Sequence, residues 1–376
     1  MKAEILGIQL NMWGLYCAIG AAASLAAAGV FCRARGLKKG SAPLLGLLSV
    51  IMGIICSRCF YCLVVTLTQT RMPIAAWLQA TDGGWSMYGM IGGVFLGAWL
   101  SGKILREKPV RMLDAVSVGL PLMITAERIG EGALEQLFDY GRSPQNPLSA
   151  GFFTVMNPVE NTYVPAVYHI KAAAAGVMFL ALVFSLLKSA RRDGNLWISF
   201  MILCGAGGVL TESLRYDHFL VFSFVRLEQV LAALLLLGGV IAAGHRCRHN
   251  QKILYISALV SMLLTVTGCI GIEFALDRVS VANRIVVYAV MICSLLIPVI
   301  HAFVLLHSSD GSFSRRKVNI PVWSGMILSV AEICAIGTEM SRIHSTNSFM
   351  LIILGSAVCE FLFLAGTAVF CRRNPT

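Results

Sequence analysis

The chain has 376 residues, of which 57% are hydrophobic and only 13% are charged, and its formal net charge is +11. Soluble domains carry about 45–50% apolar and about 25% charged residues. This composition excludes a soluble enzyme, a disordered chain and a secreted disulfide scaffold, and it leaves room for about ten membrane spans of about 20 residues. In a soluble protein the basic excess would suggest a nucleic-acid partner, whereas in a membrane protein it is first of all a topology signal.

Eleven apolar segments follow one another along the chain, and the connections between them differ in charge. The segments lie at about 13–32, 43–67, 85–104, 113–130, 164–187, 195–213, 225–244, 253–275, 285–307, 320–340 and 348–371. Most of the 30 Lys and Arg residues lie in every second connection, at 33–39, 103–111, 188–192, 246–252, 315–317 and 372–373. Because cytoplasmic connections are rich in Lys and Arg, this alternation predicts a multi-pass protein with its N-terminus outside and its C-terminus in the cytoplasm. We therefore expect no nucleic-acid partner.

A few charged residues are not needed for orientation. Five basic residues lie within or at the ends of apolar segments: Arg58, Arg128, Lys171, Arg215 and Arg226. The last four segments contain no Lys or Arg but carry four acidic residues: Glu273, Glu332, Glu339 and Glu360. A charge at membrane depth is costly and is by default a functional-site hypothesis. The sequence therefore predicts an all-α polytopic membrane protein with a seven-span core, residues 1–249, a small external head at about 131–163, and a four-span extension, residues 250–376.

The third apolar segment carries a stripe of glycines. Gly89, Gly93 and Gly97 are spaced at i, i+4 and i+8, so they lie on one face of a helix. Such a face lets a neighbouring helix approach closely. It could also let a lipid chain or headgroup reach the backbone, and both interpretations stay open from the sequence.

Polar residues gather where the core segments reach the outer side. The fourth segment ends in Glu127, Arg128 and Glu131, with Glu135 one turn further, and the fifth opens with His169 and Lys171. The sixth ends in Glu212 and Arg215, and the seventh opens with Arg226 and Gln229. Because Arg is suited to bidentate phosphate recognition, we expect these residues to form a phospholipid-headgroup site. The alternatives are a structural ion-pair cluster and a local Glu212–Arg215 pair at i, i+3.

Six short motifs in order resemble those of one family. The motifs lie at residues 11–16, 83–93, 127–130, 140–142, 165–169 and 212–217. Across about residues 5–245 the sequence resembles the prolipoprotein diacylglyceryl transferase family. That resemblance implies a bacterial plasma (inner) membrane enzyme with seven spans and a small periplasmic head. It implies transfer of diacylglyceryl from phosphatidylglycerol to the lipobox cysteine thiol of a preprolipoprotein. It implies membrane lipids as partners, and neither a metal nor another cofactor.

The resemblance also suggests which residues form the site. It implies that Arg128 binds the phosphate. It also implies a headgroup-binding role for Gly130, Tyr168, Glu212, Arg215 and Gln229. Trp13 and Arg226 are added because they lie at the outer ends of the first and seventh segments. The chain departs from the family where Tyr88 replaces a histidine and Gly208 replaces an arginine. Tyr88 is a poor base because the pKa of tyrosine is about 10, so His169, Glu131 and Glu135 are the better candidates for the catalytic base.

Three hypotheses about function follow. The first is an active but divergent diacylglyceryl transferase. The second is a relative without that activity, which binds phospholipid or lipoprotein, and Tyr88 and Gly208 motivate it. The third is a transporter, which the acidic residues of the extension would suit. A transporter would be expected to contain an inverted repeat, and the sequences of the two halves show none.

Overall fold

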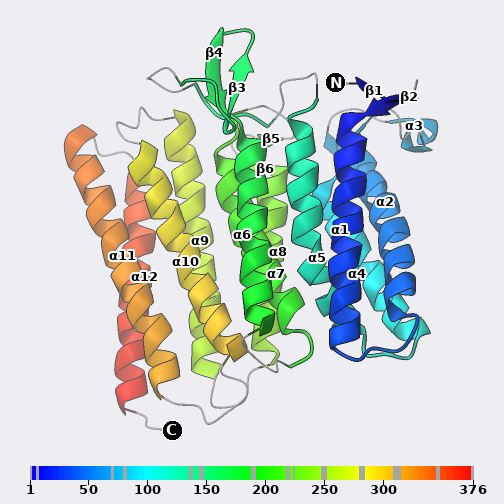
Figure 1. Cartoon of the computed structure of the whole chain (residues 1–376). Coiled ribbons are helices and arrows are strands. Elements are labelled where there is room, and N and C mark those ends of the chain that lie inside the picture. Colours follow the sequence, from blue (N-terminus) through cyan, green and yellow to red (C-terminus); the bar gives the residue numbers. More distant parts are fainter. Residues whose placement is uncertain are drawn as a thin grey trace. The chain divides into compact units, whose positions relative to one another are not determined.

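The computed structural model of the chain describes residues 2–5, 8–68, 72–78, 83–134, 139–143, 148–187, 192–216, 221–222, 225–246, 252–278, 284–307, 315–343 and 348–373. Within these ranges eleven helices are long (Figure 1): α1 Met12–Ala34, α2 Ser41–Thr68, α4 Met87–Ile104, α5 Pro109–Glu131, α6 Val167–Leu187, α7 Asn195–Ser213, α8 Leu227–Gly244, α9 Lys252–Arg278, α10 Arg284–His307, α11 Arg315–Ile343 and α12 Ser348–Arg373. A short helix, α3, spans Ile74–Leu78.

Three antiparallel hairpins connect or precede the helices: β1 Lys2–Ile5 with β2 Ile8–Asn11, β3 Thr154–Asn157 with β4 Thr162–Pro165, and β5 Val221–Phe222 with β6 Val225–Arg226. The hairpin β3–β4 projects beyond the ends of α5 and α6, at the same end as the N-terminus (Figure 1). It lies in the part of the sequence that was expected to form a head.

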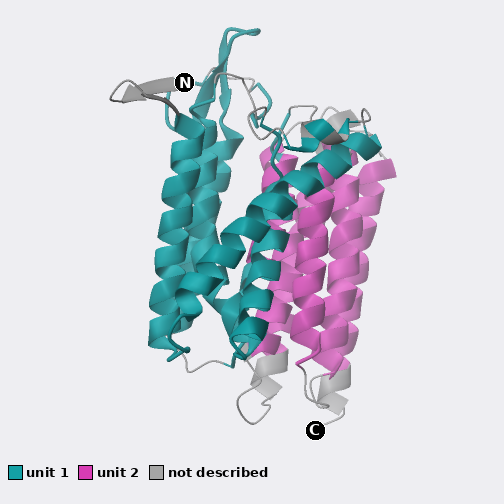
Figure 2. Ribbon diagram, turned by 90° about the vertical axis from the view of Figure 1, so that its right-hand side faces the viewer, with its two compact units in different colours: residues 1–200, 214–220 teal, residues 201–213, 221–376 magenta. Residues whose placement is uncertain are grey.

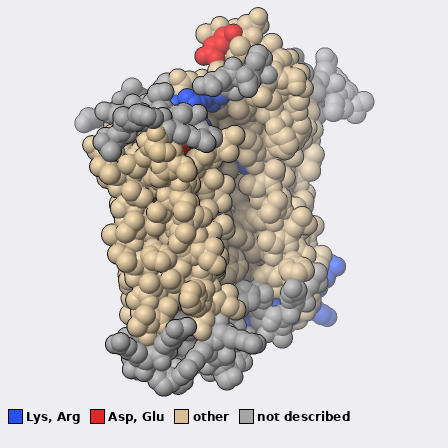
Figure 3. Space-filling view, turned by 90° about the vertical axis from the view of Figure 1, so that its left-hand side faces the viewer, with Lys and Arg blue, Asp and Glu red and all other residues tan. Residues whose placement is uncertain are grey.

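The prediction of an all-α polytopic membrane protein is confirmed. The eleven long helices match the eleven apolar segments, and ten of them are long and apolar enough to cross a membrane. The helix α4 is not among the ten, because its glycines and Lys103 lower its mean hydropathy. Helices suit this setting because they satisfy every backbone hydrogen bond internally. On the face drawn in Figure 3, a broad band is formed mainly by uncharged residues, and Lys, Arg, Asp and Glu lie mostly toward its two ends.

The chain divides into two compact units (Figure 2). Unit 1 comprises residues 1–200 and 214–220, and unit 2 comprises residues 201–213 and 221–376. The boundary lies inside α7, so the contacts group part of α7 and all of α8 with α9–α12. The sequence-based division at residue 249 groups them with the first seven spans instead, and that division stays a prediction.

In unit 1 the glycine stripe of α4 packs against α2. A Cβ atom added at Gly89 would lie 2.8 Å from the carbonyl oxygen of Cys56, and one added at Gly97 would lie 2.5 Å from that of Leu48. A Cβ at Gly93 would overlap the backbone of Met52. The helix-packing interpretation is therefore right. The lipid-access interpretation is wrong, because the backbone of α2 covers this face.

We predict that Gly93→Leu destabilises unit 1 by about 3 kcal/mol, because the side chain has to push α2 away. The matched control is Gly92→Leu, one residue earlier, where an added Cβ meets no atom within 4 Å. Thermal unfolding of the detergent-purified protein measures the difference. Equal unfolding temperatures for the two variants would contradict the packing described here.

The start of α7 is fixed by a carboxylate from α5. Asp114 is buried, and its two oxygens accept the backbone N–H groups of Gly194 at 2.5 Å, Leu196 at 3.0 Å and Trp197 at 3.0 Å. These N–H groups have no partner inside the helix, and the carboxylate also complements the positive end of the helix dipole.

Asp114→Ala is expected to cost about 2 kcal/mol, because three backbone donors lose their acceptor in a buried position. Asp193→Ala serves as the control. Asp193 pairs with Arg111 at 2.9 Å and Lys108 at 3.4 Å in a more exposed setting, and its removal should cost less than about 1 kcal/mol. Chemical denaturation of both variants decides the comparison, and similar losses would count against the capping role of Asp114.

Candidate functional site

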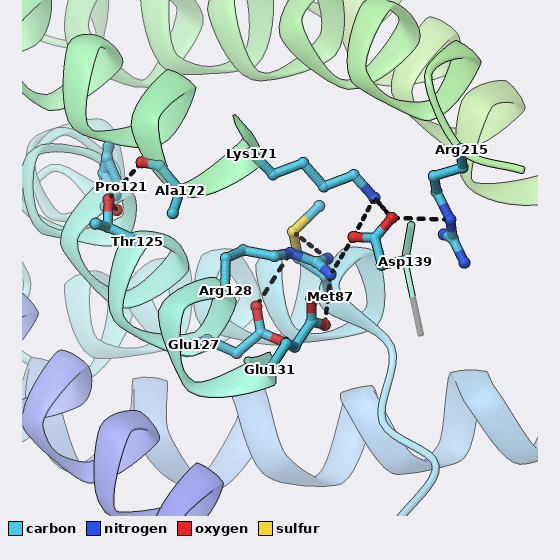
Figure 4. Close-up of polar contacts among 10 residues, drawn as sticks. All are labelled: Met87, Pro121, Thr125, Glu127, Arg128, Glu131, Asp139, Lys171, Ala172 and Arg215. Atoms are coloured by element: carbon cyan, nitrogen blue, oxygen red, sulfur yellow. Dashed lines mark hydrogen bonds and ion pairs between the residues drawn. The ribbon is translucent and has the colours of Figure 1, made fainter. Parts of the chain in front are cut away.

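Three cationic side chains converge on a single carboxylate in unit 1 (Figure 4). The Nζ atom of Lys171 lies 2.9 Å from Oδ2 of Asp139, Nε of Arg215 lies 3.0 Å from Oδ1, and Nη1 of Arg128 lies 3.6 Å from Oδ2. Asp139 is fully buried and the three cationic side chains are at most 6% exposed. We call these four residues, together with Glu127 and Glu131, the Asp139 cluster.

Arg128 has further partners on its own helix. Its Nη1 atom lies 2.6 Å from Oε1 of Glu131, and its Nε atom lies 3.2 Å from Oε2 of Glu127. The sulfur of Met87, at the start of α4, lies 3.3 Å from Nη2. The cluster thus contains three carboxylates and three cations. This balance matters because a buried charge without a partner costs several kcal/mol.

The segment around Asp139 is positioned by backbone hydrogen bonds. Asp139 has a positive φ of 51°, a conformation that Asp tolerates better than most residues. Its carbonyl oxygen accepts the N–H groups of Val167 at 3.0 Å and Tyr168 at 3.3 Å, so it caps the start of α6. Gly141 then pairs with Arg215 in an isolated bridge. The segment therefore connects the start of α6 to the residues after α7, which brings Lys171 and Arg215 to the same carboxylate.

Another deep basic residue, Arg58, holds the start of α4 instead. Its guanidinium donates to the carbonyl oxygens of Gly83, of Gly84 at 2.9 Å and of Trp77 at 3.3 Å. Gly84 has a φ of +76°, and an added Cβ would lie 2.8 Å from Nη1 of Arg58, so a larger residue does not fit there. Arg58 thus shapes the loop before Met87. These contacts give Arg58 a structural role.

The other predicted site residues of unit 1 are placed by their own local contacts. Gly130 packs on α1, since an added Cβ would lie 2.8 Å from Cβ of Tyr16. Trp13 is in the first turn of α1, where its N–H donates to the side chain of Asn11 at 3.1 Å. Tyr88 follows Met87 in the first turn of α4, and its hydroxyl oxygen is buried.

His169 packs against Phe152, which lies just before the hairpin β3–β4 of the head. Its ring stacks on Phe152 with centroids 4.1 Å apart, its Nδ1 atom hydrogen-bonds to the carbonyl oxygen of Phe152, and Tyr168 packs on its edge at 4.4 Å. If Nδ1 donates that bond, Nε2 keeps a lone pair, and this atom lies 3.2 Å from the Cβ position of Gly132. Glu135 lies outside the described residues.

The remaining predicted residues belong to unit 2. Glu212 is buried in α7, and Arg226 is the residue immediately before α8. Gln229 donates from Nε2 to Oε1 of Glu273 on α9 at 2.8 Å, and both side chains are buried. Gln229 therefore contacts the extension. The sequence suggested a headgroup-binding role for Gln229 and did not indicate a contact with the extension.

Sequence reasoning did not select Asp139 as a site residue. The residue lies between the aromatic residues Phe138 and Tyr140 in the predicted head. Its partners Lys171, Arg128 and Arg215, in contrast, are all among the residues for which the sequence predicts a headgroup site. Across the ranges that the structure describes, no group of three or more His, Cys, Asp or Glu has the arrangement of a metal site.

Two comparisons relate this chain to known proteins. A sequence model described as prolipoprotein diacylglyceryl transferase matches residues 2–244, which ends at the end of α8. The chain is also 22% identical over 249 residues to the phosphatidylglycerol–prolipoprotein diacylglyceryl transferase of Clostridioides difficile (strain 630), across 66% of this chain and 95% of that protein. With two thirds of its length matched from the N-terminus through α8, the chain belongs to the prolipoprotein diacylglyceryl transferase family.

Proposed function

We propose that this protein transfers the diacylglyceryl group of phosphatidylglycerol to the thiol of a lipobox cysteine in a preprolipoprotein. Family membership supports an activity of the diacylglyceryl transferase type. The observation that carries the site assignment is the convergence of Arg128, Lys171 and Arg215 on the carboxylate of Asp139. A phosphodiester is the anion that such a group of cations would hold in a membrane.

In the proposed reaction, the cysteine sulfur forms a bond to the glyceryl carbon, and the bond between that carbon and the phosphate oxygen breaks. Glycerol phosphate leaves with the electron pair, and the thiol proton goes to a base. A thiol near pKa 8.5 is mostly protonated at neutral pH, so a base beside it raises the reactive thiolate fraction. Arg128 stabilises the negative charge that grows on the leaving phosphate.

Glu131 is our first choice for the base, because it lies 2.6 Å from the guanidinium of Arg128. When Glu131 takes the thiol proton, the cluster loses one negative charge at the same time as the phosphate gains one. The total charge of the cluster and the bound phosphate is thereby unchanged during the step. His169, Tyr88 and Glu135 remain the other candidates from the sequence.

We further propose that the protein lies in the bacterial plasma membrane with its N-terminus outside and its C-terminus in the cytoplasm. The basic connections support this orientation. The hairpin β3–β4 and the hairpin β1–β2 lie at the same end of unit 1, as an external head near an external N-terminus requires. Phosphatidylglycerol of the outer leaflet and the lipobox segment of the preprolipoprotein would then meet the Asp139 cluster from that side.

A second candidate function is a relative that binds phospholipid or lipoprotein without transferring the acylated group. It is favoured by Tyr88 and Gly208, which stand where the family resemblance implies His and Arg, and by Glu131, which gives Arg128 an internal partner. In that case the cations would hold the headgroup, and no thioether would form.

Incubation of the purified full-length protein with a lipobox peptide in phosphatidylglycerol vesicles separates the two candidates. Transfer predicts that mass spectrometry finds the peptide heavier by one diacylglyceryl group, with glycerol phosphate released in equal amount. Vesicles of phosphatidylcholine, which cannot release glycerol phosphate, are the control. A peptide that binds to the protein but stays unmodified would overturn the transfer proposal and support the second candidate.

A further inference from the structure

The described interior of the extension carries several buried acidic residues. Four glutamates of α9, α11 and α12 are 1–8% exposed: Glu273, Glu332, Glu339 and Glu360. The Lys and Arg residues of α9–α12 all stand in the first or last turns of these helices. An ionised carboxylate at membrane depth is costly unless a cation, a proton or several hydrogen bonds compensate it.

The four carboxylates differ in their surroundings. Glu273 accepts the hydrogen bond from Gln229, and Glu339 lines a small cavity of about 10 Å³ among apolar side chains near one end of the helices. Glu332 and Glu360 lie near the middle of the candidate spans 319–341 and 348–369. For each of these two, Oε1 is fully buried and accepts no hydrogen bond from any residue that the structure describes. One oxygen of each of these two carboxyl groups is therefore available to a ligand.

Hydroxyl groups from α9 and α10 face the two carboxylates. Ser294 of α10 faces Glu332, and Ser261 of α9 faces Glu360. Ser261 is fully buried, and its oxygen has no well-aligned hydrogen-bond partner among the described residues. At Gly268 of α9 an added Cβ would lie 3.1 Å from Oγ of Ser356 and 3.9 Å from Oγ of Ser294. The missing side chain of this glycine lets the two hydroxyl groups lie close to the backbone of α9.

We propose that α9–α12 bind a monovalent metal cation between Glu332 and Glu360, with Ser261 and Ser294 as further ligands. Carboxylate and hydroxyl oxygens are the ligands of hard cations, and four such oxygens without a nearby Lys or Arg favour a cation over an anion. One cation and one proton together neutralise the two carboxylates. This site lies outside the part of the chain that the family match covers, and it does not depend on the transfer reaction.

Protons compete with the cation at this site, so the neighbouring titratable groups matter. The thiol of Cys269 on α9 has Glu273, Glu332 and Glu360 as electrostatic neighbours, and that of Cys293 on α10 has Glu332. His301 lies two turns further along α10, next to Gly325, and its Nδ1 bonds to the carbonyl oxygen of Ile297 at 2.8 Å. We assign the exchange of proton for cation to Glu332 and Glu360, because their oxygens are the proposed ligands, whereas His301 and the two thiols are not.

Carbodiimide labelling of the wild-type, full-length protein tests the proposal directly. Dicyclohexylcarbodiimide modifies protonated carboxyl groups in apolar surroundings, and peptide mass spectrometry locates the product. With choline chloride as the salt, we expect modification of Glu332 and Glu360. With sodium or potassium chloride at ten times the dissociation constant, labelling of the carboxyl that exchanges its proton for the cation should fall about tenfold, because only about a tenth of the sites is left free, whereas the carboxyl that keeps its proton still reacts. Equal labelling in all three salts would overturn the proposal.

Glu→Gln variants at Glu332, Glu360 and Glu339 provide the second test. The unfolding temperature of the wild type should rise with sodium or potassium at constant ionic strength and then saturate. Glu332→Gln and Glu360→Gln should lose this response, whereas the matched control Glu339→Gln on the same helix as Glu332 should keep it. Loss of the response in Glu339→Gln as well would overturn the assignment to Glu332 and Glu360. If a variant fails to fold, the labelling of the wild-type protein still tests whether Glu332 and Glu360 bind a cation.

Discussion

Asp139→Ala is expected to destabilise unit 1 by about 3–5 kcal/mol, because it leaves Lys171 and Arg215 buried without their carboxylate. The substitution keeps the carbonyl oxygen of residue 139, which caps the start of α6. The lost stability therefore measures the contribution of the Asp139 side chain alone. Denaturant unfolding of the purified protein measures it. Glu160→Ala, at an exposed position of the head, is the control and should change stability by less than about 0.5 kcal/mol.

A double variant distinguishes lost pairing from general damage to the fold. Lys171→Met added to Asp139→Ala removes one of the two cations that lost the Asp139 carboxylate, so the double variant should be more stable than the sum of the single losses predicts. Strict additivity of the two losses would show that Asp139 and Lys171 are not energetically coupled. The 2.9 Å contact between them would then contribute little to stability.

Arg128→Lys is expected to lower diacylglyceryl transfer about 10²–10³-fold while the protein stays folded. Lys keeps the positive charge but lacks the planar, bidentate guanidinium that reaches Glu127, Glu131 and the proposed phosphate position. Rates of peptide modification in phosphatidylglycerol vesicles measure the effect, with the unfolding temperature recorded alongside.

Arg111→Lys is the matched control for this measurement. Arg111 lies near the start of α5, where it pairs with Asp193, and Arg128 lies at the opposite end of the same helix. Arg111→Lys should therefore leave the transfer rate unchanged. An Arg128→Lys variant as active as the wild type would remove Arg128 from the proposed reaction and leave its contacts in the cluster as its role.

Local patterns in the sequence predicted those parts of the structure that depend on neighbouring residues. The eleven long helices follow from runs of apolar residues, because such runs can satisfy their backbone only as helices in a membrane. The contact between Arg128 and Glu131 follows from a spacing of three residues on one helix. The order of six motifs was enough to indicate the family, and the match over residues 2–244 confirmed it.

The centre of the candidate site could not be predicted in this way. Asp139 meets Lys171, which is 32 residues away, and Arg215 after the next long helix, and no periodicity relates these positions. The partner of the glycine stripe of α4 could not be predicted either, because only the packed structure shows that the stripe faces α2. Gln229 pairs with Glu273, 44 residues away, although the resemblance suggested a headgroup-binding role for Gln229.

The sequence by itself determined that the chain is a polytopic membrane protein, that its deep basic residues precede residue 245, and which family it resembles. These properties are set by composition and by short-range order, so they survive without knowledge of the packing. Only the tertiary structure decided which deep charges meet: Arg128, Lys171 and Arg215 share Asp139, whereas Arg58 binds backbone carbonyl groups. The physical reason is that a buried charge is stabilised by whichever opposite charge or dipole the packed helices bring within about 3 Å, and the packing depends on the whole chain.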